Sequence, residues 1–423
     1  MKEEFLHYLW ANKKLASHQL NLVDGRSLQV LNYGKLNLDT GPDFFNSTVL
    51  LEELKWSGNV EMHLRSSDWY AHKHHLDATY DNVILHVVYV YDSAVFINGE
   101  EIPTLELKNI INPYAYFQYQ NLLKSNLTIA CKPFLPLDNL STFQQIGIAM
   151  ANRFNRKTEE FYRYYQEGGS DLKQVLHVLL FQSFGGRVNK LPFQELAMRT
   201  PYKILLKESW DGFRLVAMLL GVSGLLVSAN NHPYTDELKQ TWKFIKQKHN
   251  LESMSASSWR FSGVRPHSFP TMNIVQLAHF ITNWRYESLP VSANHIGFLR
   301  DKFKIETHNY WQHHYSFKSK SKTKHNSTIS HQLQDRVLIN CFALFFWFRS
   351  RLKNKDSDMQ LAIDLLQSVR PERNRLIEEW EKLGVEVENA FDSQALIEQK
   401  NIFCDNKKCL QCKIGNFILS KKS

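Results

Sequence analysis

The stretch from Gly41 to Val88 constrains the fold more than any other part of the chain, because it combines strand periodicity with a dense set of groups that bind metals or move protons. Around Glu61, apolar and polar residues alternate, so Glu61 and His63 share one face of a predicted strand. Asp43 follows a Gly-Pro turn and opens a second apolar run, residues 44–51. If the two strands pair, Asp43 reaches the face that carries Glu61 and His63.

The first 112 residues have the pattern of a small sheet domain. An amphipathic helix is predicted over residues 3–12, and about six short strands follow it. A histidine-rich segment, residues 68–77, is predicted to be a loop or a short helix. The predicted strands are residues 28–33, 44–51, 54–64, 82–91, 94–97 and 102–107, the last two flanking the turn signal Asn98-Gly99.

From residue 113 onward the pattern becomes nearly all helical, with no repeat of fixed period. One helix is predicted over residues 140–166, and another over residues 172–183 ends at Gly185-Gly186. The sequence therefore predicts an α+β protein. Residues 1–112 would form an N-terminal mixed β-sheet domain with few helices, and residues 113–423 a mainly α-helical region.

Composition bears on partners and location. Lys and Arg outnumber Asp and Glu by 51 to 42, and the net charge of +9 suits contact with nucleic acid, although proteins without that partner share such a balance. The N-terminus lacks the apolar segment of a signal peptide. The longest apolar runs, residues 215–227 and 337–348, are too short or too interrupted to span a bilayer comfortably. We therefore expect a cytoplasmic protein without a membrane partner.

Asp43, Glu61 and His63 are the predicted catalytic residues. Two carboxylates and a nitrogen base on neighbouring strands suit a divalent cation and a water molecule, and oxygen ligands favour Mg²⁺ or Mn²⁺. Such a cation lowers the pKa of the water and shields charge on a phosphate. If imidazoles dominate instead, Zn²⁺ is favoured and the reaction class stays open. The second-line candidates are His72, His74, Asp77 and His86.

A second predicted metal site lies among the cysteines. An odd, clustered set of five Cys argues against a disulfide framework. Cys404, Cys409 and Cys412 have the spacing C-x4-C-x2-C, and its C-x2-C half lets two thiolates bind one metal. Cys131, in a predicted loop, is the natural fourth ligand of a zinc ion or an iron–sulfur cluster, whereas Cys341 lies in an apolar helix. The alternative is a set of free thiols.

The arrangement of Asp43, Glu61 and His63 resembles the PD-(D/E)xK nuclease superfamily, which has the restriction-endonuclease-like fold. In that superfamily an Asp begins one strand and Glu-x-Lys lies on the next. Asp43 matches the Asp and Glu61 the Glu, while His63 stands where Lys is usual. A neutral His accepts a proton near pH 7 but brings no fixed positive charge. The resemblance implies metal-dependent hydrolysis of phosphodiester bonds.

Over essentially its whole length, the chain also resembles the uncharacterised domain-of-unknown-function family 2851. This resemblance implies one continuous architecture and brings no assigned activity. It is carried by Gly41-Pro42-Asp43-Phe44, Gly58-x-Val60-Glu61-x-His63, Asp68-Trp69, His72-x-His74-x2-Asp77-x2-Tyr80, Leu85-His86-Val87-Val88, Arg265-Pro266, Phe269-Pro270, Gln276-Leu277-Ala278, Ser393-Gln394-Ala395-Leu396 and Cys404-x4-Cys409-x2-Cys412-x2-Gly415-Asn416.

Two functions are consistent with these patterns. The first is a metal-dependent phosphodiesterase or nuclease that acts on nucleic acid through Asp43, Glu61 and His63. The second is a non-catalytic binding or scaffold protein with a structural metal site, in which Asp43 caps a turn and Glu61 lies on a solvated strand face. The chain has no P-loop, no dinucleotide-binding glycine fingerprint and no G-x-S-x-G elbow, which disfavours three common classes of enzyme.

Overall fold

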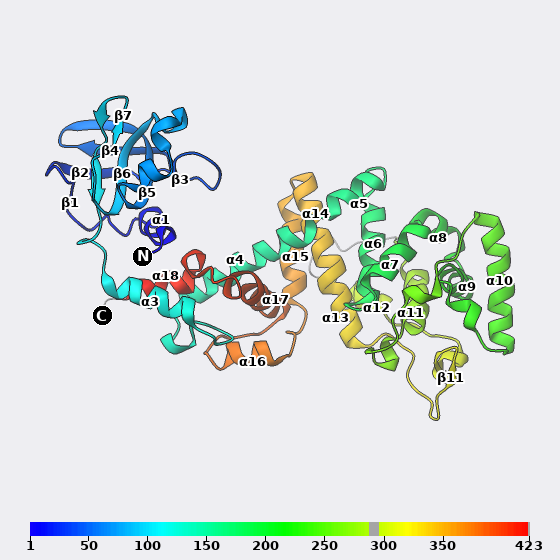
Figure 1. The fold of residues 1–423 in the computed structure, drawn as a ribbon. Helices are drawn as coiled ribbons and strands as arrows, with labels where there is room; N and C mark the ends of the chain where they lie inside the picture. Colours follow the sequence, from blue (N-terminus) through cyan, green and yellow to red (C-terminus); the bar gives the residue numbers. More distant parts are fainter. Residues whose placement is uncertain (287–295, 422–423) are drawn as a thin grey trace. The chain divides into compact units, whose positions relative to one another are not determined.

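The computed structural model describes residues 1–286 and 296–421, and it confirms the α+β class (Figure 1). The chain forms two compact units: unit 1 comprises Met1–Gln145 and Lys400–Ser423, and unit 2 comprises Ile146–Gln399. Unit 1 contains the large sheet, and unit 2 is almost entirely helical. This division differs from the predicted boundary at residue 112, because the first helices after the sheet and the C-terminal segment both belong to unit 1.

Unit 1 is built on a seven-stranded mixed sheet. The strand order is β1-β2-β4-β5-β6-β9, and β3 pairs with β4. β4 and β5 are antiparallel, with Phe44 opposite Val60, whereas β5, β6 and β9 run parallel. The strands are β1 (Leu20–Asn21), β2 (Ser27–Asn32), β3 (Lys35–Leu36), β4 (Phe44–Leu51), β5 (Leu54–Arg65), β6 (Val83–Val90) and β9 (Thr104–Glu106).

The centre of the sheet is covered on both faces. Six consecutive residues of β6, from Val83 to Val88, are buried. Gly58 lets β5 approach β6 closely, because a Cβ atom there would lie 2.4 Å from Cγ2 of Ile84 and 2.7 Å from the carbonyl oxygen of Asn82. On α1 (Glu3–Ala11), the Trp10 ring lies edge-on to the ring of Tyr33, between β2 and β3. It is also close to Phe44 of β4.

The connection from β5 to β6 is short and holds three histidines, His72, His74 and His75. It contains α2 (Asp68–Ala71) and two 3₁₀ turns, η1 (His74–Leu76) and η2 (Ala78–Tyr80). This matches the predicted histidine-rich loop or short helix. The predicted hairpin forms around Asn98-Gly99, but its strands β7 (Phe96–Ile97) and β8 (Glu100–Glu101) are only two residues long, because the following residues join the main sheet as β9 beside β6.

The C-terminal segment packs inside unit 1. α18 (Lys413–Ser420) lies against α3 (Pro113–Lys124), and the Lys413 backbone N–H donates to the side-chain oxygen of Gln145 at 2.8 Å. On α3, the Tyr119 hydroxyl donates to the Glu4 carboxylate at 2.5 Å, which links this helix to α1. Through these contacts, helices that follow the sheet and the C-terminal segment belong to the same compact unit as the sheet.

Unit 2 is organised around α6, which is buried from Val175 to Gly185. Its C-terminus is followed by Gly186, as the predicted helix end requires. The predicted helix over residues 140–166 is divided at residues 159–160 into α4 and α5. The helices are α4 (Asn139–Thr158, which crosses into unit 2), α5 (Phe161–Glu167), α6 (Leu172–Gly185), α7 (Lys190–Arg199), α8 (Tyr202–Glu208), α9 (Gly212–Val222), α10 (Pro233–His249), α11 (Pro270–Trp284), α12 (Ile296–Lys302), α13 (His331–Val337), α14 (Ala343–Lys353), α15 (Asp356–Gln367), α16 (Arg375–Glu381) and α17 (Ala390–Glu398).

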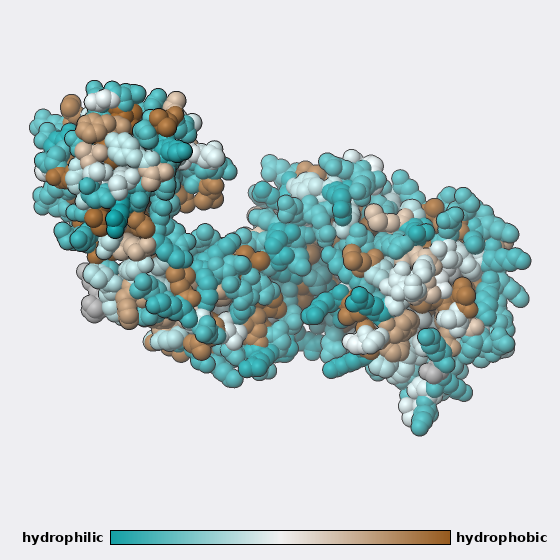
Figure 2. All heavy atoms as spheres, viewed as in Figure 1, coloured by the Kyte–Doolittle hydropathy of each residue, from teal (hydrophilic) through white to brown (hydrophobic). Residues whose placement is uncertain are grey.

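Two further elements interrupt the regular helices of unit 2. β10 (His314–Ser316) and β11 (Ser319–Lys320) form a small hairpin, and a π-helical turn, η9 (Leu338–Phe342), joins α13 to α14. Among the described residues, no helix is both long and apolar enough to cross a bilayer. On the face shown in Figure 2, apolar residues are scattered among hydrophilic ones in each unit.

Candidate metal centre

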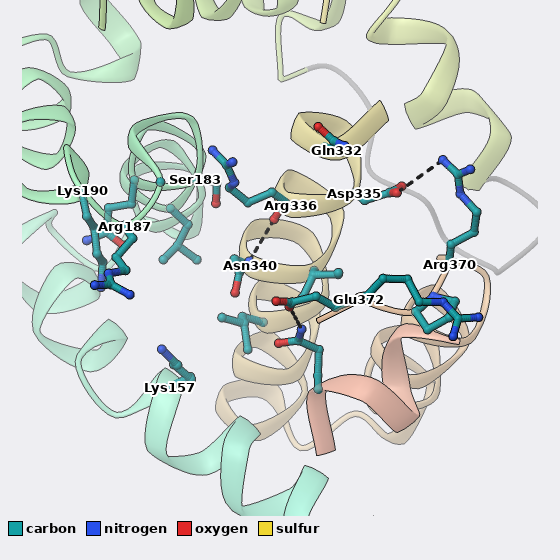
Figure 3. Close-up of a pocket in the computed structure, with 18 of the residues that line it drawn as sticks. Lys157, Ser183, Arg187, Lys190, Gln332, Asp335, Arg336, Asn340, Arg370 and Glu372 are labelled. Atoms are coloured by element: carbon teal, nitrogen blue, oxygen red, sulfur yellow. Dashed lines mark hydrogen bonds and ion pairs between the residues drawn. The ribbon is translucent and has the colours of Figure 1, made fainter. Parts of the chain in front are cut away.

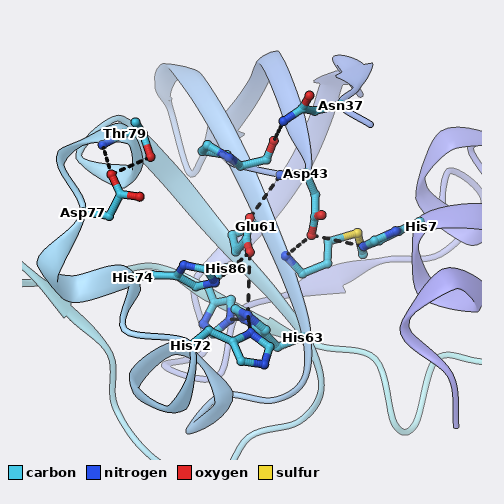
Figure 4. Close-up of polar contacts among 12 residues, drawn as sticks. His7, Asn37, Asp43, Glu61, His63, His72, His74, Asp77, Thr79 and His86 are labelled. Atoms are coloured by element: carbon cyan, nitrogen blue, oxygen red, sulfur yellow. Dashed lines mark hydrogen bonds and ion pairs between the residues drawn. The ribbon is translucent and has the colours of Figure 1, made fainter. Parts of the chain in front are cut away.

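Three imidazoles converge beside β5. His63 lies on β5, while His72 and His74 come from the connection that follows it, and one ring nitrogen of each lies within 4.8 Å of the others (Figure 4). Nε2 of His63 is 3.1 Å from Nδ1 of His72. The Glu61 carboxylate completes the group, with Oε1 at 3.3 Å from Nε2 of His74 and 3.6 Å from Nε2 of His63. We call these four residues the histidine centre.

The spacing of these atoms suits ligation of one ion. Zinc–nitrogen bonds of about 2.0–2.1 Å place neighbouring ligand atoms of a tetrahedron about 3.3 Å apart. The three separations given above, 3.1, 3.3 and 3.6 Å, bracket that value. Three of the six separations among the four donor atoms therefore have ligand-to-ligand values, and the nitrogens of the three imidazoles all lie within 4.8 Å of one another.

The Glu61 side chain is buried, and its other oxygen accepts a hydrogen bond from the Asp43 backbone N–H at 3.0 Å. Burial and then the neighbouring Asp43 charge raise the pKa of Glu61 to about 9, against the lowering effect of the Asp43 N–H. At neutral pH this carboxyl group holds a proton unless a cation lies beside it. The histidine centre thus contains a carboxylate whose ionisation depends on a positive neighbour.

Asp43 lies next to Glu61, on the loop that enters β4. Its Oδ2 atom accepts a hydrogen bond from the Met62 backbone N–H at 3.0 Å and lies 3.1 Å from Nε2 of His7. Although burial lowers the pKa of His7, the Asp43 carboxylate beside it outweighs this effect and raises the pKa overall. With Glu3, these residues form a second set of donor atoms within 4.8 Å of one another. Asp43 therefore adjoins the histidine centre through its backbone and belongs to a second group through its carboxylate.

His86, on β6, supports the histidine centre from behind. Its Nε2 atom is 2.8 Å from Nδ1 of His63, and both rings are fully buried. Burial and neighbouring imidazoles lower the pKa of His63 to about 2 and that of His86 to about 3, so both rings are neutral. If Nε2 of His63 faces a metal, its Nδ1–H donates to His86, which fixes the tautomer of the ligand. His86 is thus placed to orient His63.

Two aromatic residues hold the imidazoles in place. Trp69 is fully buried, with its ring edge-on to the rings of His74 and His86. Tyr80 stacks on His74 with ring centroids 3.9 Å apart. Trp69 and Tyr80 are among the residues that carry the family resemblance, but neither was predicted to have a role in the site. The signal was the placement of two large aromatics within a histidine-rich loop, where they order a segment that has almost no regular structure.

Asp77, the last of the predicted site residues, lies apart from the donor atoms of the histidine centre. Asp77 is exposed, and its carboxylate accepts hydrogen bonds from the backbone and the hydroxyl of Thr79, so it begins η2 rather than facing the imidazoles (Figure 4). Glu3 and His7 were missed. Their spacing of four residues places both on one face of α1, and this polar face was the available signal. His72 is exposed and His74 partly so, which opens the histidine centre to solvent.

The predicted cysteine site is also in unit 1. Burial, and then the thiols of Cys412 and Cys409, raise the pKa of Cys131 to about 12. Burial and Cys412 likewise raise the pKa of Cys409 to about 11, although Lys407 opposes the shift. These three side chains therefore influence one another across a long separation in sequence. A metal bound by them and Cys404 stays a prediction.

Comparison with protein-family models matches residues 3–375 to a family described as "Protein of unknown function (DUF2851)". The matched range includes the histidine centre, Asp43 and His7, and it ends before Cys404. Neither the curated proteins nor the solved structures gave a match. Because the family model covers most of the chain, the protein belongs to this family of unknown function.

Proposed function

We propose that the protein is a metal-dependent hydrolase of phosphodiester bonds, with nucleic acid as its substrate class. The single observation that carries this proposal is the convergence of His63, His72, His74 and Glu61, with donor atoms at ligand spacing. A divalent cation there supplies a nucleophile at neutral pH and offsets the charge that develops on a phosphate.

The donor set favours a transition ion. Three imidazoles and one carboxylate are typical ligands of zinc and similar ions, whereas Mg²⁺ takes oxygen ligands and keeps several waters. The histidine centre therefore supports Zn²⁺ ahead of the Mg²⁺ or Mn²⁺ expected for a site of Asp43 and Glu61 alone. In this proposal His63, His72, His74 and Glu61 hold the ion, and His86 orients His63.

Asp43 is the group proposed to handle protons. Its carboxylate is partly exposed beside the histidine centre and is paired with His7 at 3.1 Å. In this proposal the Asp43 carboxylate accepts a proton from the attacking water molecule. The choice of a phosphodiester substrate is supported by the net charge of +9 and by the position of Asp43 and Glu61 at the start of β4 and on β5, as in PD-(D/E)xK nucleases.

The test compares two exposed histidines in the same connection. His72→Ala removes a proposed ligand, whereas His75→Ala removes an imidazole whose recorded contact is with the ring of Tyr70. The chelator-treated proteins would be titrated with Zn²⁺, Mn²⁺ and Mg²⁺ by calorimetry and then assayed on bis(p-nitrophenyl) phosphate and single-stranded DNA. We expect one tightly bound ion and metal-dependent hydrolysis in the wild type and in His75→Ala, and the loss of both in His72→Ala.

Two outcomes would contradict this function. If both variants bind metal like the wild type, the histidine centre is not the metal site. If metal binds and depends on His72 but no phosphodiester is cleaved, the centre is structural and the protein is a binding or scaffold protein. DNA binding should also weaken steeply with salt if the basic charge contacts phosphates.

A further inference from the structure

Unit 2 contains a large polar cavity that is open to solvent and lies outside the histidine centre (Figure 3). Its volume is about 1320 Å³. The walls come from α4, α6, α13, η9 and the segment of residues 370–373, which are widely separated in sequence. Small-molecule sites commonly have volumes of about 300–1,000 Å³, so this cavity has room for a ligand of that size together with ordered water.

Basic side chains without carboxylate partners surround the cavity. Within residues 1–286 and 296–421, no carboxylate oxygen lies within 4.0 Å of the charged groups of Lys157, Arg187 or Arg336. They come from three different elements: the end of α4, the turn after α6, and α13. By contrast, Lys190 on the same wall pairs with Glu160 at 3.1 Å.

Arg336 is the most constrained of the three. Its guanidinium is half-buried and packs against Gly186, where an added Cβ would lie 2.8 Å from Nη1. Gly186 also has φ +57°, a conformation that favours glycine. Burial lowers the pKa of Arg336, but the group stays charged. Because this guanidinium is partly shielded from water and has no counter-charge in the described part of the protein, an anionic ligand would stabilise it.

The backbone at this wall is irregular. Asn340 lies in the π-helical turn η9, and such turns are frequent at functional sites. Its side-chain oxygen accepts a hydrogen bond from Nη2 of Arg153 at 3.1 Å, and its amide donates to the carbonyl of Arg336 at 3.2 Å. Arg153 is buried, and its Nη1 atom has no hydrogen-bond partner among the described residues. A second, deeper guanidinium thus lies behind the cavity wall.

The lining also indicates what kind of anion fits. The carboxylates of Glu160, Asp335, Glu372 and Glu388 lie on the same walls as the unpaired cations, together with the amides of Gln182 and Asn340. Carboxylates repel a continuous phosphate backbone, but they accept hydrogen bonds from hydroxyl groups. We propose that this cavity binds a phosphorylated small molecule that carries hydroxyl groups, and that the unpaired basic side chains, Arg336 and Lys157 among them, supply the positive charge that holds its phosphate.

Calorimetric titration of the full-length protein tests this proposal, with ribose 5-phosphate and pyrophosphate as probes. We expect saturable binding, weakened about tenfold or more by Arg336→Gln and by Lys157→Gln, because each removes a charge-assisted contact. Arg336→Lys keeps the charge but not the two-pronged donor, so it should retain part of the affinity. The matched control is Arg351→Gln, which removes an exposed charge of α14 outside the cavity.

Since Arg336 is half-buried, thermal unfolding of each variant would show whether it folds. Lys157 is exposed, so Lys157→Gln keeps the test decisive even if Arg336→Gln does not fold. The proposal is overturned if the wild type binds neither probe, if Lys157→Gln binds as the wild type does, or if Arg351→Gln weakens binding equally. Preferential binding of a single-stranded oligonucleotide, lost in Lys157→Gln, would also overturn it by making the ligand a nucleic acid.

Discussion

Two buried glutamates, Glu61 in unit 1 and Glu208 in unit 2, handle buried charge in opposite ways. In unit 1, buried groups avoid charge: His63 and His86 are neutral, and Glu61 holds a proton unless a cation is bound. In unit 2, Glu208 is fully buried but contacts three basic side chains of α9 and α10, Arg214, Lys248 and His249. The neutral histidine centre can bind a cation without breaking an existing ion pair. The Glu208 carboxylate, by contrast, already has three basic partners, so its role is to stabilise the fold.

This contrast separates buried groups that could bind a ligand from buried groups that stabilise the fold. A buried ionisable group with protein partners of opposite charge is explained by the fold. One without such partners, like Glu61 among imidazoles or Arg336 at the cavity, is energetically incomplete and points to a ligand. Substitutions of groups with and without such partners test this distinction.

Glu208→Ala should destabilise the protein by about 3–5 kcal/mol, because it leaves Arg214, Lys248 and His249 around an empty buried position. Denaturant unfolding followed by circular dichroism measures the loss. A change below about 1 kcal/mol would mean that the triple contact is no stronger than a surface pair. The three basic partners of Glu208 would then not account for a buried charge in unit 2.

His86→Ala should weaken zinc binding by about 10- to 100-fold, because it removes the acceptor that orients His63. Competition with a chromogenic chelator measures the affinity, and His75→Ala is the control with an expected change near zero. Thermal unfolding of the metal-free proteins shows whether the packing around Trp69 survives. Equal zinc affinity in wild type and His86→Ala would remove His86 from the site.

The two buried glutamates should give opposite pH dependences. The raised pKa of Glu61 favours its protonated form in the fold, so its contribution to stability is present below pH 4.5 and is lost as the pH rises through about 9. Burial alone would raise the pKa of Glu208, but hydrogen bonds from Lys248, His249 and Arg214 lower it to about 2. Its contribution is present above pH 4.5 and is lost as the pH falls through about 2.

Unfolding of the metal-free protein at a series of pH values measures both trends. Glu61→Gln should flatten the decline in stability between neutral and alkaline pH, because the amide cannot ionise. The same decline in Glu61→Gln and wild type would show that another group titrates in this range.

Glu195→Ala should change stability by less than about 0.5 kcal/mol, because its pair with Arg199 is exposed and lies one helical turn away on α7. The measurement is the same denaturant unfolding used for Glu208→Ala. A loss of more than about 1 kcal/mol would show that exposure does not separate weak from strong ion pairs in unit 2.

The sheet of unit 1 could be predicted well because its signals are local. Alternation gave β4 with the observed limits, and it placed Glu61 and His63 on one strand face close to Asp43. His72 and His74 were predicted only as second-line candidates, since a loop has no period from which side-chain direction can be inferred. His7 was missed because its contact with Asp43 crosses from α1 to β4, a pairing that depends on tertiary packing.

The cavity of unit 2 could not be predicted from the sequence. Arg336 and Lys157 are far apart in the chain, and each looks like an ordinary surface residue of a helix. Both residues are candidates for ligand binding because no carboxylate among the described residues pairs with them. Whether a carboxylate lies nearby depends on tertiary packing, which the local sequence around each residue does not show. The helix break at residues 159–160 and the return of α18 to α3 were missed for the same reason.

The π-helical turn η9 has a consequence for how this chain can change. A π turn holds one residue more than an α turn, so α13 and α14 are joined as if a single residue had been inserted between them. Each residue of an α-helix advances the chain by about 100°, so the extra residue sets the directions in which the buried Phe345 and Phe346 of α14 point. Deleting one residue within 338–342 would convert the π turn into regular α-helix. Asn340 would then leave its position at the cavity, and the aromatic side chains of α14 would be rotated relative to α13. Length variation among relatives should therefore avoid this turn, even though most helix junctions tolerate it.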